Sequence, residues 1–251
     1  MSGHSKWASI KHKKGKADAK RGKLFTKIIR EIIVAARIGG GDPDSNPRLR
    51  TALLAARTAN MSKDNVVNAI KKGTGELEGV NYEDALYEGY GPGGVAVMAE
   101  VLTDSKNRTA SEIRKIFSRS GGDLGAAGCV AWMFTKKGLI VFEKAAATED
   151  QLMDIALEAG ADDVKDAGSV WEVTTSPDTY EAVKEAFDKK GLKYTLAEIS
   201  MIPQTTITLS GKEAEQMVHL VEALEEHEDV QNVYSNYDIS DEELERISAL
   251  E

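Results

Sequence analysis

Residues 87–102, YEGYGPGGVAVMAEVL, decide how the middle of this chain folds. The turn residues Gly91-Pro92-Gly93-Gly94 separate two runs rich in strand-forming side chains, so the stretch is predicted to form a strand pair. The second run, residues 95–102, is apolar on both faces, which is typical of a strand covered on both sides. This strand is therefore predicted to lie at the centre of a β-sheet.

The strand pair is followed by an alternation of helices and strands. Thr109 and Glu112 have the spacing of a capping box and predict a helix start, and residues 129–134 are predicted to form the next strand. The alternation of strand and helix then repeats, and a second capping box, at Thr148 and Gln151, predicts the start of the next helix. Further strands are predicted at residues 139–142, 170–174, 194–202, 205–209 and 230–237.

Two split β-α-β units of the ferredoxin-like type account for this order, one inserted in the other. The predicted fold class is therefore α+β and multidomain, with an N-terminal helical bundle, a basic arm and two ferredoxin-like α/β domains. The domains are predicted at residues 1–79 (basic arm and helical domain), 80–134 plus 204–240 (α/β domain), 135–203 (inserted α/β domain) and 241–251 (C-terminal tail).

The helical part of the prediction rests on three amphipathic segments. Apolar residues recur at helical spacing from Leu24 to Ala36, before the glycines of residues 39–41. Asn46 followed by Pro47 predicts the start of a second helix, and Ser62 that of a third. Three short helices with one apolar face each are predicted to form a small bundle.

The charge is divided between the two ends of the chain. The whole chain has a formal net charge of −9. Residues 1–72 hold 17 Lys and Arg against 5 Asp and Glu, and residues 73–251 hold the remaining 15 against 36. Exposed charges are screened over roughly 8 Å at physiological salt, so a distant acidic part does not cancel a basic one.

The basic end is predicted to bind nucleic acid, because each Lys or Arg near a phosphate releases condensed counterions. Trp7 and His12 lie among the lysines, as in a surface for stacking and hydrogen bonding. A merely solubilising tail is the simpler alternative, but the basic charge continues onto a predicted helix. The predicted nucleic-acid-binding residues are Lys6, Trp7, Lys11, His12, Lys13, Lys14, Lys16, Lys20, Arg21, Lys23, Lys27 and Arg30.

No catalytic or metal-binding pattern stands out. The single cysteine, Cys129, excludes a disulfide framework, and the four histidines lack metal-ligand spacing. No P-loop or nucleophile–base pair is present, so we expect no catalytic residues, no metal, no cofactor and no obligatory small molecule. No apolar run of about 18 residues and no secretory h-region occur, so we expect a cytoplasmic protein without a membrane partner.

A second candidate interaction surface combines the glycine-rich turn with a polar cluster at a strand-to-helix junction, a common place for functional groups. Its residues are Tyr90, Pro92, Asp104, Asn107 and Arg108. An enzyme or small-molecule sensor that uses residues 87–94 and 104–108 stays open as an alternative.

Three blocks of sequence resemble the YebC/PmpR family. The first is Gly3-His4-Ser5-Lys6-Trp7 with Ile10-Lys11-His12-Lys13-Lys14, and the second includes Lys63-Asp64-Asn65 and Ala69-Ile70-Lys71-Lys72-Gly73. The third contains Tyr87-Glu88-Gly89-Tyr90-Gly91-Pro92-Gly93-Gly94 and Asn107-Arg108-Thr109-Ala110. Ser105-Lys106 departs from the family's more usual Asn-Arg.

The resemblance implies three domains and a non-enzymatic, cytoplasmic regulator that acts on nucleic acid. Some members are named transcriptional regulators that bind promoter DNA. Others, including mitochondrial activators of cytochrome oxidase subunit synthesis, act in translation. We therefore expect a DNA-binding transcriptional regulator, and the alternative is an RNA-binding, ribosome-associated translation factor that contacts ribosomal RNA and relieves stalling on proline-rich stretches.

Overall fold

The computed structural model describes residues 17–249, and their side chains from residue 22 onward. The described residues divide into two compact units. One contains residues 17–129 and 212–233, and the other contains residues 130–211 and 234–249.

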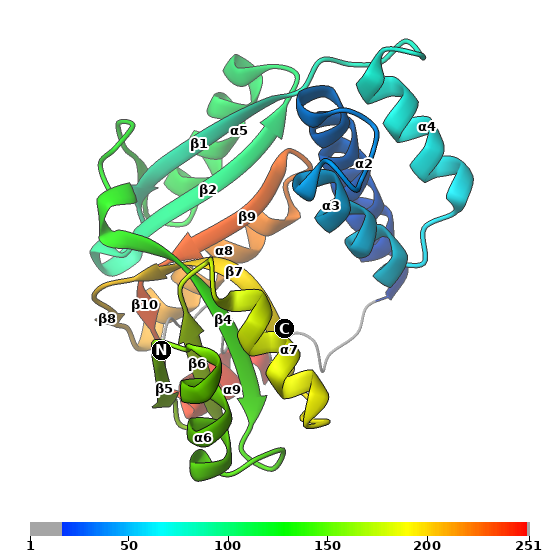
Figure 1. The fold of residues 1–251 in the computed structure, drawn as a ribbon. Coiled ribbons are helices and arrows are strands. Elements are labelled where there is room, and N and C mark those ends of the chain that lie inside the picture. Colours follow the sequence, from blue (N-terminus) through cyan, green and yellow to red (C-terminus); the bar gives the residue numbers. More distant parts are fainter. Residues whose placement is uncertain (1–16, 250–251) are drawn as a thin grey trace. The chain divides into compact units, whose positions relative to one another are not determined.

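Three helices form the helical part of the first unit (Figure 1): α2 (Ala17–Gly39), α3 (Pro47–Thr58) and α4 (Lys63–Thr74). The predicted caps are confirmed, since Asn46 accepts a hydrogen bond from the Leu49 amide and Ser62 from the Asn65 amide. The helices bury a shared core of aliphatic side chains, and full burial of such a side chain stabilises the fold by about 1.5–3 kcal/mol. This core includes Ile28, Ile32, Ile33, Leu49, Ala52, Ala56 and Ala69.

A four-stranded sheet completes the first unit. Its order is β3-β1-β2-β9, with β1 (Glu83–Tyr90), β2 (Ala96–Thr103), β3 (Asp123–Leu124) and β9 (Val230–Ser235). The short helix η1 (Pro92–Gly94) links β1 to β2, which run antiparallel. Seven of the eight residues of β2 are buried, which confirms the predicted central strand.

Helices α5 (Lys106–Arg119) and α8 (Gly211–Glu226) cover one face of this sheet. Gly89 and Gly91 lie two residues apart and therefore face the same side. A Cβ atom at Gly89 would lie 2.8 Å from Phe117 of α5, and one at Gly91 would lie 2.8 Å from Met217 of α8. Both glycines thus allow the helices to approach the sheet closely.

The second unit contains a sheet of order β5-β6-β4-β7. Its strands are β4 (Phe134–Glu143), β5 (Asp163–Asp166), β6 (Val170–Thr175) and β7 (Leu196–Pro203), and its helices are α6 (Glu149–Ala159) and α7 (Tyr180–Lys189). This β-α-β-β-α-β order is the ferredoxin-like one. The aromatic rings of Phe142 and Phe187 meet edge to face in its core, with centroids 4.8 Å apart.

The remaining elements of the second unit are short. The 3-10 helix η2 covers Ala131–Met133, and β8 (Ile207–Thr208) pairs in parallel with β10 (Tyr237–Asp238). The predicted C-terminal tail contains a helix, α9 (Asp241–Ala249), which buries Leu244 and Ile247. The α+β multidomain fold class is confirmed, although only the inserted sheet has the complete ferredoxin-like order.

Two local predictions are wrong. Residues 129–133 form a turn and η2, and the strand begins only at Phe134. Helix α5 begins at Lys106, after Ser105, so Thr109 lies inside the helix, where its hydroxyl donates a buried hydrogen bond to Asp229 and does not cap the helix. The second capping box, at Thr148 and Gln151, is present as predicted.

Candidate nucleic-acid interface

One face of α2 carries three of the predicted phosphate-binding residues. Lys23, Lys27 and Arg30 are four and three residues apart, so they lie on the same side of the helix. This face lies against residues 225–229, the acidic junction that joins α8 to β9. The ammonium of Lys27 donates to the carbonyl oxygen of Glu225 (2.6 Å), and that of Lys23 lies 3.9 Å from the carboxylate of Glu226.

Arg30 makes the closest contacts with the acidic junction. Its Nη1 atom donates to the carbonyl oxygen of Glu228 (2.7 Å) and to Oδ1 of Asp229 (2.5 Å). The ring of Tyr82 lies under its guanidinium, 5.3 Å from the ring centroid. The side chain of Arg30 is only 11% exposed. In this conformation Arg30 therefore binds protein groups, and a phosphate would have to displace them.

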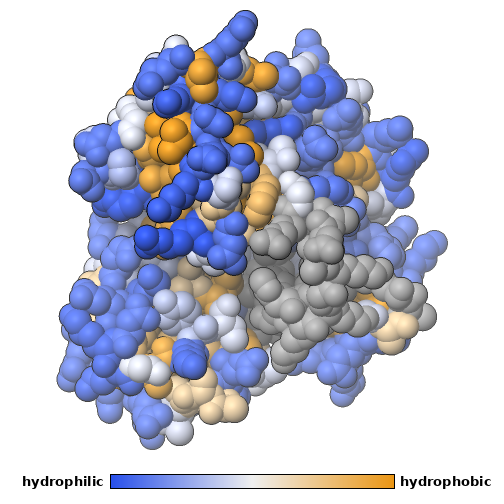
Figure 2. Space-filling model, turned by 90° about the vertical axis from the view of Figure 1, so that its right-hand side faces the viewer, coloured by the Kyte–Doolittle hydropathy of each residue, from blue (hydrophilic) through white to orange (hydrophobic). Residues whose placement is uncertain are grey.

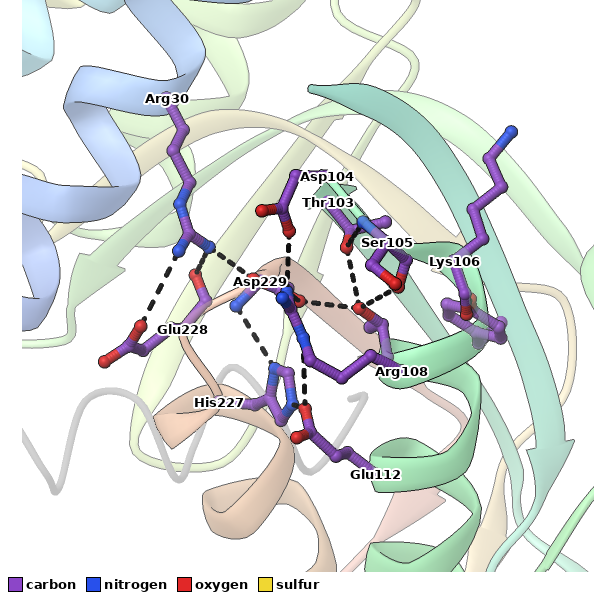
Figure 3. A network of polar contacts seen from close by, with 12 residues as sticks. Arg30, Thr103, Asp104, Ser105, Lys106, Arg108, Glu112, His227, Glu228 and Asp229 are labelled. Atoms are coloured by element: carbon purple, nitrogen blue, oxygen red, sulfur yellow. Dashed lines mark hydrogen bonds and ion pairs between the residues drawn. The ribbon is translucent and has the colours of Figure 1, made fainter. Parts of the chain in front are cut away.

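Asp229 is the centre of the network drawn in Figure 3. Its Oδ2 atom accepts hydrogen bonds from Thr109 (2.6 Å) and from Nη2 of Arg108 (2.8 Å), while Oδ1 binds Arg30. Arg108 also binds Asp104 at 2.8 Å. Burial by itself would raise the pKa of Asp229, but the bonds from Thr109 and Arg108 and the charge of Arg30 bring the pKa below its ordinary value.

His227 extends this network to α5. The Asp229 amide donates to Nδ1 of His227 (3.1 Å), so in the neutral ring Nε2 carries the proton and donates to Oε2 of Glu112 (2.8 Å). Glu112, His227 and Asp229 have donor atoms close enough to share a metal ion. However, both oxygens of Asp229 already face arginines, and added positive charge is disfavoured there. The arrangement therefore favours a charge network over a metal site.

The other predicted nucleic-acid-binding residues are placed less completely. Lys20 and Arg21 belong to α2, which begins at Ala17. Lys6, Trp7, Lys11, His12, Lys13, Lys14 and Lys16 lie outside the described residues.

The residues of the second candidate interaction surface lie at two opposite ends of the hairpin formed by β1 and β2. Tyr90 pairs with Ala96 at one end of β1 and β2, and Glu83 pairs with Thr103 at the other. The seven-residue separation corresponds to about 23 Å along a strand. Tyr90 and the buried Pro92 therefore lie at the opposite end from Asp104, Asn107 and Arg108. Only Asp104 and Arg108 of this set join the network around Asp229.

The acidic junction was not identified by sequence reasoning. In the sequence, residues 225–229 look like the acidic end of a predicted helix, and they do not stand out because acidic residues are common in this part of the chain. The one signal in the sequence is the position of Asp229 directly before Val230, the first residue of the last predicted strand, and the structure buries this acid to 2% exposure. An acidic side chain placed between a helix and a buried strand needs a cationic partner.

Together, the fold and this network define a multidomain α+β protein whose basic helical domain precedes two α/β sheets. None of the helices among residues 17–249 is both long and apolar enough to cross a membrane.

Comparison with known proteins identifies the family to which this multidomain α+β protein belongs. The family model for the TACO1/YebC protein N-terminal domain matches residues 5–76, and the model for the TACO1/YebC second and third domain matches residues 82–237. The chain belongs to the TACO1/YebC family, which confirms the resemblance seen in its sequence blocks.

Its relatives match along almost the whole chain. A probable transcriptional regulatory protein of Desulfatibacillum aliphaticivorans is 64% identical over 244 residues, 97% of this chain and 99% of that protein. A probable transcriptional regulatory protein of Syntrophobacter fumaroxidans is 62% identical over 249 residues, which are 99% of this chain and 100% of that protein. The crystal structure of a conserved hypothetical protein from Aquifex aeolicus is 47% identical, with a TM-score of 0.77 over 89% of this chain and 93% of that one.

Proposed function

We propose that this protein is a non-enzymatic transcriptional regulator that binds DNA through its basic N-terminal domain. The observation that carries the proposal is the division of charge, with 17 basic against 5 acidic residues in residues 1–72 and 15 against 36 in the rest. A basic domain on an acidic protein attracts a polyanion locally, while the acidic part limits indiscriminate binding. The relatives named probable transcriptional regulatory proteins support a role in gene regulation.

Exposed cations of α3 and α4 support the proposal. Arg57, Lys63, Lys71 and Lys72 are exposed, and no ion pair to them is recorded within residues 17–249. Unlike Lys27 and Arg30, they can meet a phosphate without first leaving a protein partner. In the view drawn in Figure 2, hydrophilic residues make up most of the coloured surface, and patches of hydrophobic residues lie among them.

A second candidate function is binding of ribosomal RNA, and the arginines of α3 favour it. Arg48 binds Glu31 and Asp84, and Arg50 donates to the carbonyl oxygens of Pro43 and Asp44. These two arginines are therefore occupied, which leaves α3 few side chains to read base edges in a major groove. Binding that depends on phosphates and shape suits structured RNA as well as DNA.

The first experiment is in-cell crosslinking of the protein, followed by sequencing of the attached nucleic acid. The control is a variant in which Lys11, Lys13, Lys14 and Lys16 are replaced by Ala. Reads at discrete promoters that are lost in the variant would support the proposal. Reads concentrated on ribosomal RNA would replace it with the second candidate.

A binding assay in vitro tests the domain directly. The four-lysine variant should bind duplex DNA more weakly, and its logarithmic salt dependence should flatten by about 0.9 per lost phosphate contact. A control variant replaces Lys190 and Lys193, two exposed lysines of the inserted domain, by Ala and so tests the effect of losing basic charge elsewhere on the chain. Unchanged affinity and salt dependence in the four-lysine variant would contradict binding through this segment.

A further inference from the structure

Helix α5 is a basic helix in the acidic part of the chain. Residues 73–251 hold 15 basic residues against 36 acidic ones. Five of these basic residues lie in the 14 residues of α5, together with one acidic residue, Glu112. The five are Lys106, Arg108, Arg114, Lys115 and Arg119.

Protein groups bind the cations of the first half of α5 but not those of the second. Lys106 pairs with Glu83 at 2.7 Å, and Arg108 binds Asp104 and Asp229. Arg114, Lys115 and Arg119 are exposed, and no ion pair or hydrogen bond from their side chains is recorded within residues 17–249. The C-terminal half of α5 is therefore positively charged and open to a partner.

Two of these cations line a groove. Arg108, Glu112, Lys115 and Arg119 are four, three and four residues apart, so they form one stripe along the helix. The stripe borders an open hollow of about 540 Å³, which α2 and the acidic junction close on the other sides, with Lys23 of α2 in its lining. Lys115 and Arg119 lie about 6 Å apart along the helix axis, so both can contact one extended anion.

The acidic side chains in this groove already have cationic partners. Asp104 and Asp229 bind Arg108, and the carboxylate of Glu112 lies 4.0 Å from Nε of Arg108 and also accepts a hydrogen bond from His227. On the side of α2, Glu228 lies 3.6 Å from Arg30 and Glu226 lies 3.9 Å from Lys23. The groove is lined by five acidic and five basic residues besides His227, and of these basic residues only Lys115 and Arg119 make no ion pair within residues 17–249.

We propose that Lys115 and Arg119 of this stripe bind the sugar–phosphate backbone of duplex DNA and so extend the interface from the helical part of the first unit onto helix α5. This inference rests on the proposed function, because it assigns a further contact surface for the same ligand. Long, flexible cations without fixed partners suit phosphates, and they position a duplex without reading its sequence. The stripe therefore adds affinity and orientation, and sequence preference must arise elsewhere.

The test measures binding of the full chain to a fluorescein-labelled duplex DNA, and to single-stranded RNA of the same sequence, over a series of KCl concentrations. The variant Lys115→Ala/Arg119→Ala should bind duplex DNA more weakly, and its logarithmic salt dependence should flatten by about 1.8 for two lost contacts. Alanine has the highest helix propensity, so α5 is retained, and circular dichroism checks this. The matched control is again Lys190→Ala/Lys193→Ala, which removes the same charge from exposed positions of the other unit.

The four-lysine variant separates the two proposals. If it loses affinity and the α5 variant does not, the proposed function stands and the α5 surface is refuted. If the α5 variant loses affinity and the four-lysine variant does not, the α5 surface stands and binding through the N-terminal segment is refuted. An equal loss in the Lys190/Lys193 control, a loss confined to RNA, or no DNA binding by the natural protein would each overturn the α5 proposal.

Discussion

Arg30 of α2 and Asp229 at the start of β9 form an ion pair of 2.5 Å across 199 positions of sequence. The pair links the helical part of the first unit to its sheet, and Arg108 binds the second oxygen of the same carboxylate from α5. Three elements therefore meet at one buried acid. This arrangement uses Arg30, which the sequence suggested for phosphate binding, and it leaves the exposed cations of α3, α4 and α5 for a ligand.

We predict that Asp229→Asn destabilises the first unit strongly. The amide keeps the shape of the side chain but removes the charge that compensates Arg30, which is 11% exposed. Removal of one partner of a buried ion pair costs on the order of 3 kcal/mol. Urea denaturation measures the free energy of unfolding. Glu226→Gln is the matched control, because its exposed pair with Lys23 spans 3.9 Å and should contribute little.

The contribution of Asp229 should depend on pH. Because its pKa is lowered in the folded protein, the ionised carboxylate stabilises the fold above the ordinary carboxyl pKa, and this stability is lost as the pH falls through the folded pKa. The difference in unfolding free energy between the natural protein and Asp229→Asn should be constant near neutral pH and should shrink below about pH 4. A difference that stays constant on acidification would show that Asp229 acts through shape and not through charge.

Asn46 should be important for the connection between α2 and α3. Its Nδ2 atom donates to the carbonyl oxygens of Ala35 and Gly40, both at 2.8 Å, and its Oδ1 atom accepts from the Leu49 amide at 3.1 Å. Asn46→Ala removes the cap and leaves these groups unpaired, so we expect a loss of about 3 kcal/mol in unfolding free energy. Ser62→Ala, at a more exposed cap, should cost about 0.5–1 kcal/mol in the same assay. Equal losses for the two variants would contradict this account.

Gly73 should not tolerate a side chain. A Cβ atom at this position would lie 2.5 Å from the carbonyl oxygen of Ile33 and 2.6 Å from Cβ of Ala36, so Gly73→Ala forces α4 away from α2. Overpacking of this kind costs about 1–3 kcal/mol and should lower the melting temperature. Gly22→Ala serves as the contrast, because it meets no heavy atom within 4 Å and should stabilise α2 by about 1 kcal/mol. A neutral Gly73→Ala would show that the two helices pack less closely than described.

Local patterns predicted much of the fold. The caps at Asn46, Ser62 and Thr148 and the buried strand β2 follow from residues that lie within a few positions of one another. These features depend on local hydrogen bonds and on hydrophobic spacing, which are present in the sequence itself.

Other elements depend on distant partners and were misread or missed. The short strand β5, with sequence DVKD, has one buried residue and exists because it pairs with β6 at the sheet edge. Thr109 resembles a helix cap, but the buried Asp229 takes its hydroxyl at 2.6 Å. In both cases a tertiary contact outweighs the local preference.

The sequence by itself determined the family, the three helices, the alternation of helices and strands in the inserted α/β domain apart from β5, and the basic character of the N-terminal end, because each is a property of composition or of neighbouring residues. The tertiary structure alone decided which cations are available. Lys27 and Arg30 are bound by residues 225–229, whereas Lys115 and Arg119 are exposed along a groove. Charge is a property of a residue type, but its availability to a ligand depends on which groups the fold places beside it.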